Sequence, residues 1–368
     1  MYRPKKLSIR HTISWLILIF AIFLVFMKFE SGNLSLAGFV QGVNLYCIGM
    51  LLFVSADSDD IAIKSLDLSR NIQISMVPNF LLSILQVPLK VPYFQKSEIS
   101  NLHHLSSADG YIRAYGTFTS TTGFTLYLTV VFAYCLSCIN QITKFKAILL
   151  QLVSLAMLLM SQSRTALAIV LCQYLIYFMI SRRDRISSSF SFKNFRASEI
   201  RIGKWIGILV TLIFLIFPRT FNAFTTRISQ ASQSENSFFR LFSQQFSWIK
   251  SIDHSLFGDG LASHTIGVVG YSNISQQWIE RDLDRILQEA GLILGLSIIF
   301  FRFYWALSLM KSFSVLMNNR DKFMVFLLPV LVITFLQGPL YGQNDTNIFG
   351  WFFLTIFVAK YRSTKTIN

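Results

Sequence analysis

Charged residues are scarce in this sequence of 368 residues. Asp, Glu, Lys and Arg together make up 14% of the chain, whereas hydrophobic residues make up 53% and phenylalanine alone occurs 36 times. The mean hydropathy is correspondingly high, at +0.52. Because soluble globular chains are less apolar than this, the composition excludes an ordinary soluble domain and predicts an integral membrane protein.

Cysteine is scarce too, and the common motifs of nucleotide and metal chemistry are missing. The chain contains no HExxH, no P-loop and no dinucleotide fingerprint, and the GDG triplet at 258–260 alone indicates a turn. The CLSC pair at 135–138 has neither a second pair nor histidine partners, so neither a zinc nor a redox site is expected. We expect no metal and no cofactor. Buried hydrophobic side chains are the expected role of the four cysteines, Cys47, Cys135, Cys138 and Cys172.

What the sequence does contain is a series of apolar stretches. A helix needs roughly 17–25 residues to cross a bilayer, and stretches near that length recur between short polar segments. We therefore predict an all-α, polytopic membrane helical bundle of about ten transmembrane helices, forming a single membrane domain over 1–368. The predicted spans are 12–28, 35–56, 71–90, 122–140, 147–162, 164–181, 205–218, 286–306, 323–338 and 345–360.

The excess of basic residues predicts how this bundle is oriented. The chain carries 33 Lys and Arg against 18 Asp and Glu, a net charge of +15, and basic residues beside membrane spans stay on the cytoplasmic side. This places both termini and the basic loop 182–204 in the cytoplasm and leaves two long external segments, 91–121 and 219–285. The charges are dispersed among loops without an aromatic-lined groove, so nucleic acid is not an expected partner.

The large external segment is predicted to contain amphipathic helices. Phe239, Phe242, Phe246 and Ile249 recur at helical spacing. This pattern predicts a helix that lies at the membrane surface or one that only covers the bundle.

Three charged residues near the end of this segment share one face of a predicted helix. Asp282, Arg285 and Glu289 follow helical spacing on the approach to the span at 286–306. They form either intrahelical ion pairs worth only tenths of a kcal/mol or an acid–base group that handles an anionic lipid at the membrane entrance.

Arg164 is isolated, because the seventeen residues on either side of it carry no charge. A cation inside a membrane is costly and needs a reason. The arginine either snorkels to the interface and sets the depth of its span or binds an anion through its planar guanidinium.

Several short motifs follow one another along the chain: RAYGTFTSTTGFTLYL at 113–128, SQSR at 161–164, Arg240 followed by Trp248, LFGDG at 256–260 and EAG at 289–291. With a basic loop after SQSR, this order resembles the O-antigen polymerase and O-antigen ligase superfamily over residues 113–300. The resemblance implies a metal-independent membrane glycosyltransferase at the outer face of the bacterial cytoplasmic membrane. Its implied donor and main partner is an oligosaccharide carried on undecaprenyl diphosphate, within the membrane lipid.

The resemblance also implies roles for individual residues. Arg164 and Arg240 match arginines of the family and would hold the diphosphate as the sugar–phosphate bond breaks. Glu280 and Asp282 are the first candidates for the base that accepts a proton from the acceptor hydroxyl, ahead of His254 and His264. Ligase-type members usually carry a histidine where this chain has Glu280. That difference favours a polymerase over a ligase that transfers a glycan to a lipid or protein acceptor.

Further residues are candidates for substrate binding, although the arginines among them are equally explained as solvated loop charges: Arg113, Arg227, His254, Arg281, Arg285 and Glu289. A chain-length regulator and a flippase of the same pathway are the expected protein partners. The main alternative is that the chain is itself a lipid-linked sugar flippase or another transporter. Such a protein is expected to carry an internal repeat and charges at mid-span, whereas here we find no repeat and expect span centres that are nearly free of charge.

Overall fold

The computed structural model describes residues 9–30, 36–55, 68–91, 113–138, 144–186, 256–265, 281–319 and 322–366, together with residues 226, 229 and 279. Helices and the turns between them make up these segments, and none of the described residues lies in a β-strand. The prediction of an all-α protein is therefore confirmed.

The chain divides into two compact units. Unit 1 comprises residues 1–66, 237–311 and 331–368, and unit 2 comprises residues 67–236 and 312–330. Each unit is built from segments that are far apart in the sequence, so long-range helix packing holds each one together. The single membrane domain stays a prediction.

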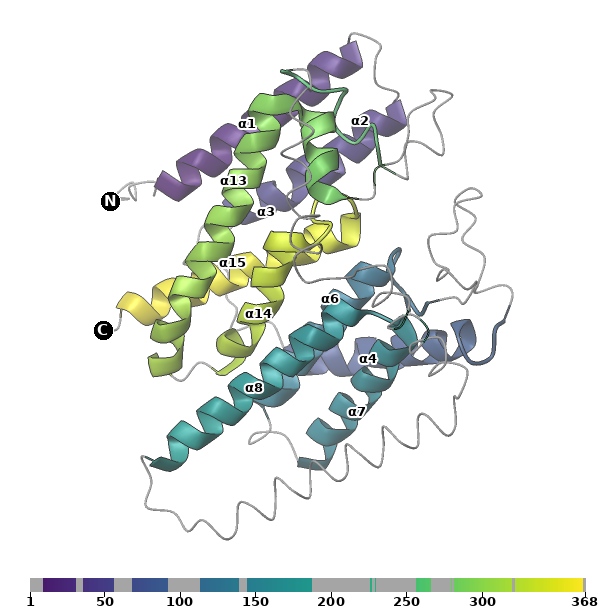
Figure 1. Ribbon diagram of the computed structural model, residues 1–368, viewed down its shortest axis with the longest axis vertical. Coiled ribbons are helices and arrows are strands. Elements are labelled where there is room, and N and C mark those ends of the chain that lie inside the picture. The colour runs from purple at the N-terminus through teal and green to yellow at the C-terminus, as the bar shows by residue number, and fades with distance from the viewer. Residues whose placement is uncertain are drawn as a thin grey trace. The chain divides into compact units, whose positions relative to one another are not determined.

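Unit 1 is formed by helices from both ends of the chain (Figure 1): α1 (Ile9–Glu30), α2 (Leu36–Gly42), the π-helix η1 (Val43–Ile48), α3 (Gly49–Ser55), most of α13 (Asp282–Asn319), the end of α14 (Lys322–Gln337) and α15 (Asn344–Thr366). Here α15 packs against α3 and η1. Gly49 permits this close approach, because a Cβ at that position would lie only 2.2 Å from Asn347 Oδ1 and 2.2 Å from Trp351 Cδ1.

Aromatic residues fill the core of unit 1. Trp351 on α15 is fully buried, and the centroid of its ring lies 5.6 Å from that of Phe53, 6.2 Å from that of Phe301 and 5.3 Å from that of Phe335. These rings come from α3, α13 and α14, so one tryptophan joins three other helices through apolar contact.

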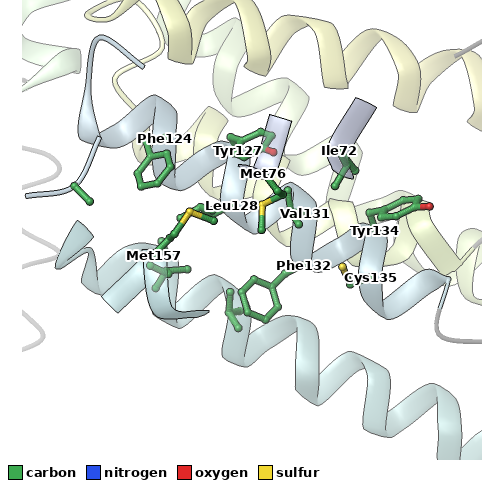
Figure 2. Packing of buried hydrophobic residues seen from close by; sticks show 14 of the residues in the cluster. Ile72, Met76, Phe124, Tyr127, Leu128, Val131, Phe132, Tyr134, Cys135 and Met157 are labelled. Carbon is green, nitrogen blue, oxygen red and sulfur yellow. The ribbon is translucent and has the colours of Figure 1, made fainter. Parts of the chain in front are cut away.

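Unit 2 is organised around α6 (Thr121–Ser137), which packs against α7 (Lys144–Ser161) and α8 (Arg164–Ile186), while α4 (Leu68–Gln86) packs against α7. Residues 123–136 of α6 are all buried, as expected for a helix that is apolar all round. Figure 2 shows Leu128, Val131 and Phe132 of α6 beside Met76 of α4 and Met157 of α7.

The four cysteines are free thiols. Cys47 and Cys135 are buried, as predicted, and Cys138 is partly buried. Cys172 is exposed on α8, where the prediction of burial is wrong.

Two polar side chains of α4 hold the segment that opens α6. Gln86 accepts hydrogen bonds from the backbone N–H groups of Tyr115 and Gly116 (both 3.1 Å), and Asn79 accepts one from Thr117 N–H (2.9 Å). Ser120 then caps α6 by accepting a hydrogen bond from the Gly123 N–H (3.1 Å). The motif at 113–128 is thus an anchored turn that leads into a buried helix.

Helix covers nine of the ten predicted spans, and the remaining range, 205–218, lies outside the described residues. The range 71–90 is helical only to Gln86, two residues before Pro88, because a proline disfavours helix in the residue before it. The range 35–56 is interrupted by η1, the π-helix that carries Tyr46.

Two of these helices are long and apolar enough to cross a membrane, by length and composition, over Arg164–Ser181 and Asp282–Met317. Shorter apolar stretches of 10–17 residues lie within other described helices, among them Ser14–Leu24 of α1 and Lys146–Ser161 of α7. The two long helices are consistent with membrane association, whereas the bundle of ten spans is not confirmed. The predicted amphipathic helix at 239–249 lies outside the described residues.

Candidate active site

The three charged residues predicted to share a helix face do so at the start of α13. Arg285 donates a hydrogen bond to Asp282, three residues earlier. Arg285 Nε lies 3.8 Å from Glu289 Oε1, four residues later. The helical spacing of the sequence thus brings one guanidinium between two carboxylates.

These ion pairs are buried. The side chains of Asp282 and Arg285 are 5% and 4% exposed, and that of Glu289 is 0% exposed. The residues do form the predicted intrahelical ion pairs, but a value of tenths of a kcal/mol applies to pairs in water and not to this buried site. In a buried pair, removal of one partner leaves an uncompensated charge and typically costs about 3–5 kcal/mol.

A second arginine, Arg302, joins Asp282, Arg285 and Glu289 to form one buried charged cluster. It donates to the other carboxylate oxygen of Asp282 and to the backbone carbonyls of Phe335 (3.0 Å) and Gly338 (2.7 Å). These carbonyls lie at the C-terminal end of α14, where backbone oxygens lack helical partners. Arg302 therefore caps α14 and neutralises Asp282 together with Arg285, which balances two arginines against two acids.

Arg302 is a charged residue near the C-terminal end of one predicted span. It lies within the predicted span 286–306 and is 1% exposed. The signal was present in the sequence, because Arg302 is the only charged residue between Glu289 and Lys311. Arg302 is thus isolated from other charges in the sequence, as Arg164 is.

Arg302 reaches Asp282 because α13 reverses direction at Gly291. The two residues are 20 positions apart, and 20 residues of straight α-helix span about 30 Å. Gly291 has φ 73° and ψ −177°, which is not helical, and a Cβ on Gly295 would lie 3.1 Å from Ile286 O. Residues 282–290 thus pack back against the helix that follows, so the predicted span 286–306 contains a reversal at Gly291 and is not one continuous helix.

The LFGDG loop docks on this reversal. The Asp259 N–H donates to Gln288 O (2.8 Å) and the Gly260 N–H donates to Glu289 O (3.1 Å). Gly258 has φ +66°, and a Cβ there would lie 2.4 Å from Gly291 N. The LFGDG and EAG motifs are therefore two halves of one backbone contact, with a glycine on each side.

Replacing Gly291 with alanine is expected to destabilise unit 1. Its φ/ψ values lie in a region that is essentially restricted to glycine, which costs about 1–3 kcal/mol for another residue, and the new methyl would meet backbone atoms of Gly258 and Leu256 at 2.4 and 2.5 Å. Unfolding of the purified protein in detergent measures the effect. Gly295→Ala is the control, because its closest contacts are at 3.1 Å. An equal loss in both variants would contradict this explanation.

Glu289 connects the docked loop to the cluster. Its Oε2 accepts a hydrogen bond from the Tyr46 hydroxyl (2.6 Å), and its Oε1 accepts one from the backbone N–H of His264 (2.9 Å). Tyr46 stacks on Tyr341 with ring centroids 4.9 Å apart. Burial raises the pKa of Tyr341, so its phenol stays neutral. Sequence reasoning missed both tyrosines, since neither lies near the charged residues in the chain.

Tyr46→Phe is expected to lower the free energy of unfolding by about 1–3 kcal/mol, because the buried carboxylate of Glu289 then loses a hydrogen bond. The matched control is Tyr174→Phe in unit 2, whose hydroxyl donates to an uncharged partner, Gln151. Its loss should be about 0.5–1.5 kcal/mol. Denaturant unfolding of both variants gives the comparison, and a smaller loss for Tyr46→Phe than for Tyr174→Phe would contradict the role assigned to Tyr46.

His264 and Asp259, both in the 256–265 segment, form a histidine–aspartate pair. His264 Nε2 and Asp259 Oδ2 are 2.9 Å apart, with the histidine side chain 9% exposed and the aspartate side chain 56% exposed. The loop thus runs from an exposed carboxylate to the buried cluster.

The other predicted site residues are placed as follows. Arg281 is 52% exposed, 3.7 Å from Asp284. Arg113 is partly buried at the start of the turn before α6. Among the described residues, no three His, Cys, Asp or Glu side chains are grouped as metal ligands. Four of the predicted residues lie outside the described residues: Arg227, Arg240, His254 and Glu280.

Arg164 belongs to unit 2 and is the first residue of α8. Gln162 adopts φ 55°, which turns the chain between α7 and α8. Ser163 Oγ then accepts a hydrogen bond from the Ala166 N–H (3.3 Å) and caps the new helix. Arg164 is exposed at this end, so the SQSR motif is a tight turn that presents a guanidinium beside a helix N-terminus.

Comparisons of the chain with protein-family models, with curated proteins and with solved structures found no match.

Proposed function

We propose that the protein is a membrane glycosyltransferase that polymerises undecaprenyl-diphosphate-linked oligosaccharide units into a cell-surface polysaccharide. The observation that carries this proposal is the order of the motifs SQSR, LFGDG and EAG, combined with the backbone contact between the last two. Two motifs that resemble those of one family and also pack against each other support that family's function more strongly than either motif alone.

Exposed apolar side chains support a place in the membrane. Large exposed residues on α1 include Leu16, Ile19 and Phe23, and on α8 they include Leu171 and Leu175, which are both 64% exposed. Apolar surface of this extent is costly in water and favourable in lipid. We propose a polytopic protein of the bacterial cytoplasmic membrane, with ten spans, both termini in the cytoplasm and the 219–285 segment outside.

Arg164 is the proposed ligand of the donor diphosphate. A basic side chain at a helix N-terminus gains nothing from the helix dipole, which favours anions there. The same dipole and the guanidinium fork together attract phosphate oxygens. Charge that develops on the departing undecaprenyl diphosphate would be stabilised there, with Arg240 as the second cation.

Asp282 is better suited to a positioning role than to that of the base. Both of its oxygens accept hydrogen bonds from guanidinium groups, and its side chain is 5% exposed. A base has to reach the acceptor hydroxyl directly or through one water. Glu280 stays a candidate base.

Deleting the gene in its host tests the proposal. A polymerase mutant should still export single repeat units and lose only the long polysaccharide. A flippase mutant should instead retain the lipid-linked unit on the cytoplasmic side, and a ligase mutant should accumulate long chains on the lipid carrier. Unchanged polysaccharide length would overturn the proposal.

A further inference from the structure

Asp259 differs from the other acids near the cluster because its carboxylate is accessible. Its side chain is 56% exposed, whereas those of Asp282 and Glu289 are 5% and 0% exposed and that of Asp284 is 14% exposed. One oxygen of Asp259 contacts His264 Nε2 at 2.9 Å. Because more than half of the Asp259 side chain is exposed, a ligand can reach its carboxylate.

The structure holds this exposed carboxylate in place. The backbone N–H of Asp259 donates to Gln288 O, and the N–H groups of Gly260 and His264 donate to the backbone and the side chain of Glu289. An exposed loop residue usually changes its rotamer freely. Here the docked backbone and the imidazole restrict the carboxylate, as a reacting group requires.

The buried cluster explains how the loop is held. Glu289 can bind the loop only if its own carboxylate is fixed, and Tyr46 and Arg285 provide that. Arg285 in turn is held by Asp282, which Arg302 fixes against the end of α14. A continuous chain of polar contacts thus runs from α14 to the loop that carries Asp259.

We propose that Asp259 is the general base of the transfer reaction and that His264 is its positioning residue. This inference rests on the proposed function. The carboxylate oxygen of Asp259 that does not contact His264 takes the proton of an acceptor sugar hydroxyl. At the same time the hydroxyl oxygen bonds to the anomeric carbon of the donor. The bond between that carbon and the phosphate oxygen breaks, undecaprenyl diphosphate leaves as the anion, and Asp259 later releases the proton to water. The substrate of this site is therefore the hydroxyl group of a sugar.

The test measures transfer by the purified full-length protein in detergent, with the lipid-linked repeat unit of its host. Asp259→Asn keeps the shape of the side chain but removes the base, and should lower kcat by about 100-fold or more, with an unchanged KM for the donor. Added formate should restore activity to Asp259→Ala, because a small carboxylate can take the place of the missing one.

His264 and two control variants complete the design. His264→Gln keeps a hydrogen-bond donor and should retain more activity than His264→Ala, because the amide can still hold Asp259. Asp345→Asn, at the start of α15, should match the wild type. Glu280→Gln tests the competing base.

The outcomes separate the inference from the function on which it rests. If the wild type forms no product, the proposed function fails. If the wild type forms product and Asp259→Asn is as active, the function stands and Asp259 is not the base. The inference is also overturned if formate leaves a folded Asp259→Ala variant inactive. It is overturned as well if Glu280→Gln abolishes transfer while Asp259→Asn does not.

Discussion

Arg302→Met is expected to lower the free energy of unfolding by about 3–5 kcal/mol, the usual cost of breaking a buried ion pair. Methionine fills a similar volume, so the loss comes from the polar contacts. Asp282 loses one of its two guanidinium partners, and the backbone carbonyl of Phe335 loses its Arg302 donor. The carbonyl of Gly338 loses one of two donors, because it keeps the hydrogen bond from the Leu340 N–H. The start of α13 and the end of α14 should then separate.

Denaturant unfolding of the purified protein gives the free energy of unfolding for this comparison. Lys311→Met is the matched control, because Lys311 lies on the same helix but is exposed, and exposed substitutions usually change stability by less than about 0.5 kcal/mol. A similar, small change in both variants would show that Arg302 does not hold the cluster together.

Arg164→Ala is expected to lower the rate of transfer by about 100-fold or more without destabilising the protein. Removal of one preorganised donor from a developing oxyanion typically costs about 100- to 1,000-fold in kcat. Arg164→Lys should give an intermediate rate, because lysine keeps the charge but lacks the planar fork that binds two phosphate oxygens.

Transfer from the lipid-linked donor, followed over time, measures these rates. Lys146→Ala is the control. Lys146 is an exposed cation at the N-terminal end of α7, whereas Arg164 follows the C-terminal end of that helix. The control is expected to have the activity of the wild type. If Arg164→Ala and Lys146→Ala are equally active, Arg164 only sets the depth of its helix in the membrane.

The helices and the local spacing of charges could be predicted from the sequence. Apolar runs between polar segments located nine helical ranges, because helix formation depends on neighbouring residues. The pairing of Arg285 with Asp282 and Glu289 followed from positions three and four residues apart. Their burial did not follow, since it depends on which other segments cover that face.

The contacts between distant segments could not be predicted. EAG looks like the middle of a helix, and only the positive φ of Gly291 reveals that the chain reverses there. That reversal brings Arg302 to Asp282 and creates the surface on which LFGDG docks. Tyr46 lies 243 residues from Glu289 in the sequence, so no local pattern links them. The sequence identified both motifs, and only the structure explains why each needs its glycine.

The most direct test of the proposed function is transfer in vitro by the wild-type protein, purified in detergent and supplied only with the undecaprenyl-diphosphate-linked repeat unit of its host. A polymerase should convert this single substrate into a ladder of products that differ by one repeat unit, and Arg164→Ala at the same protein concentration should leave the substrate unchanged. Absence of any product from the folded wild type, together with passage of the same lipid across liposomes that contain it, would instead identify a transporter.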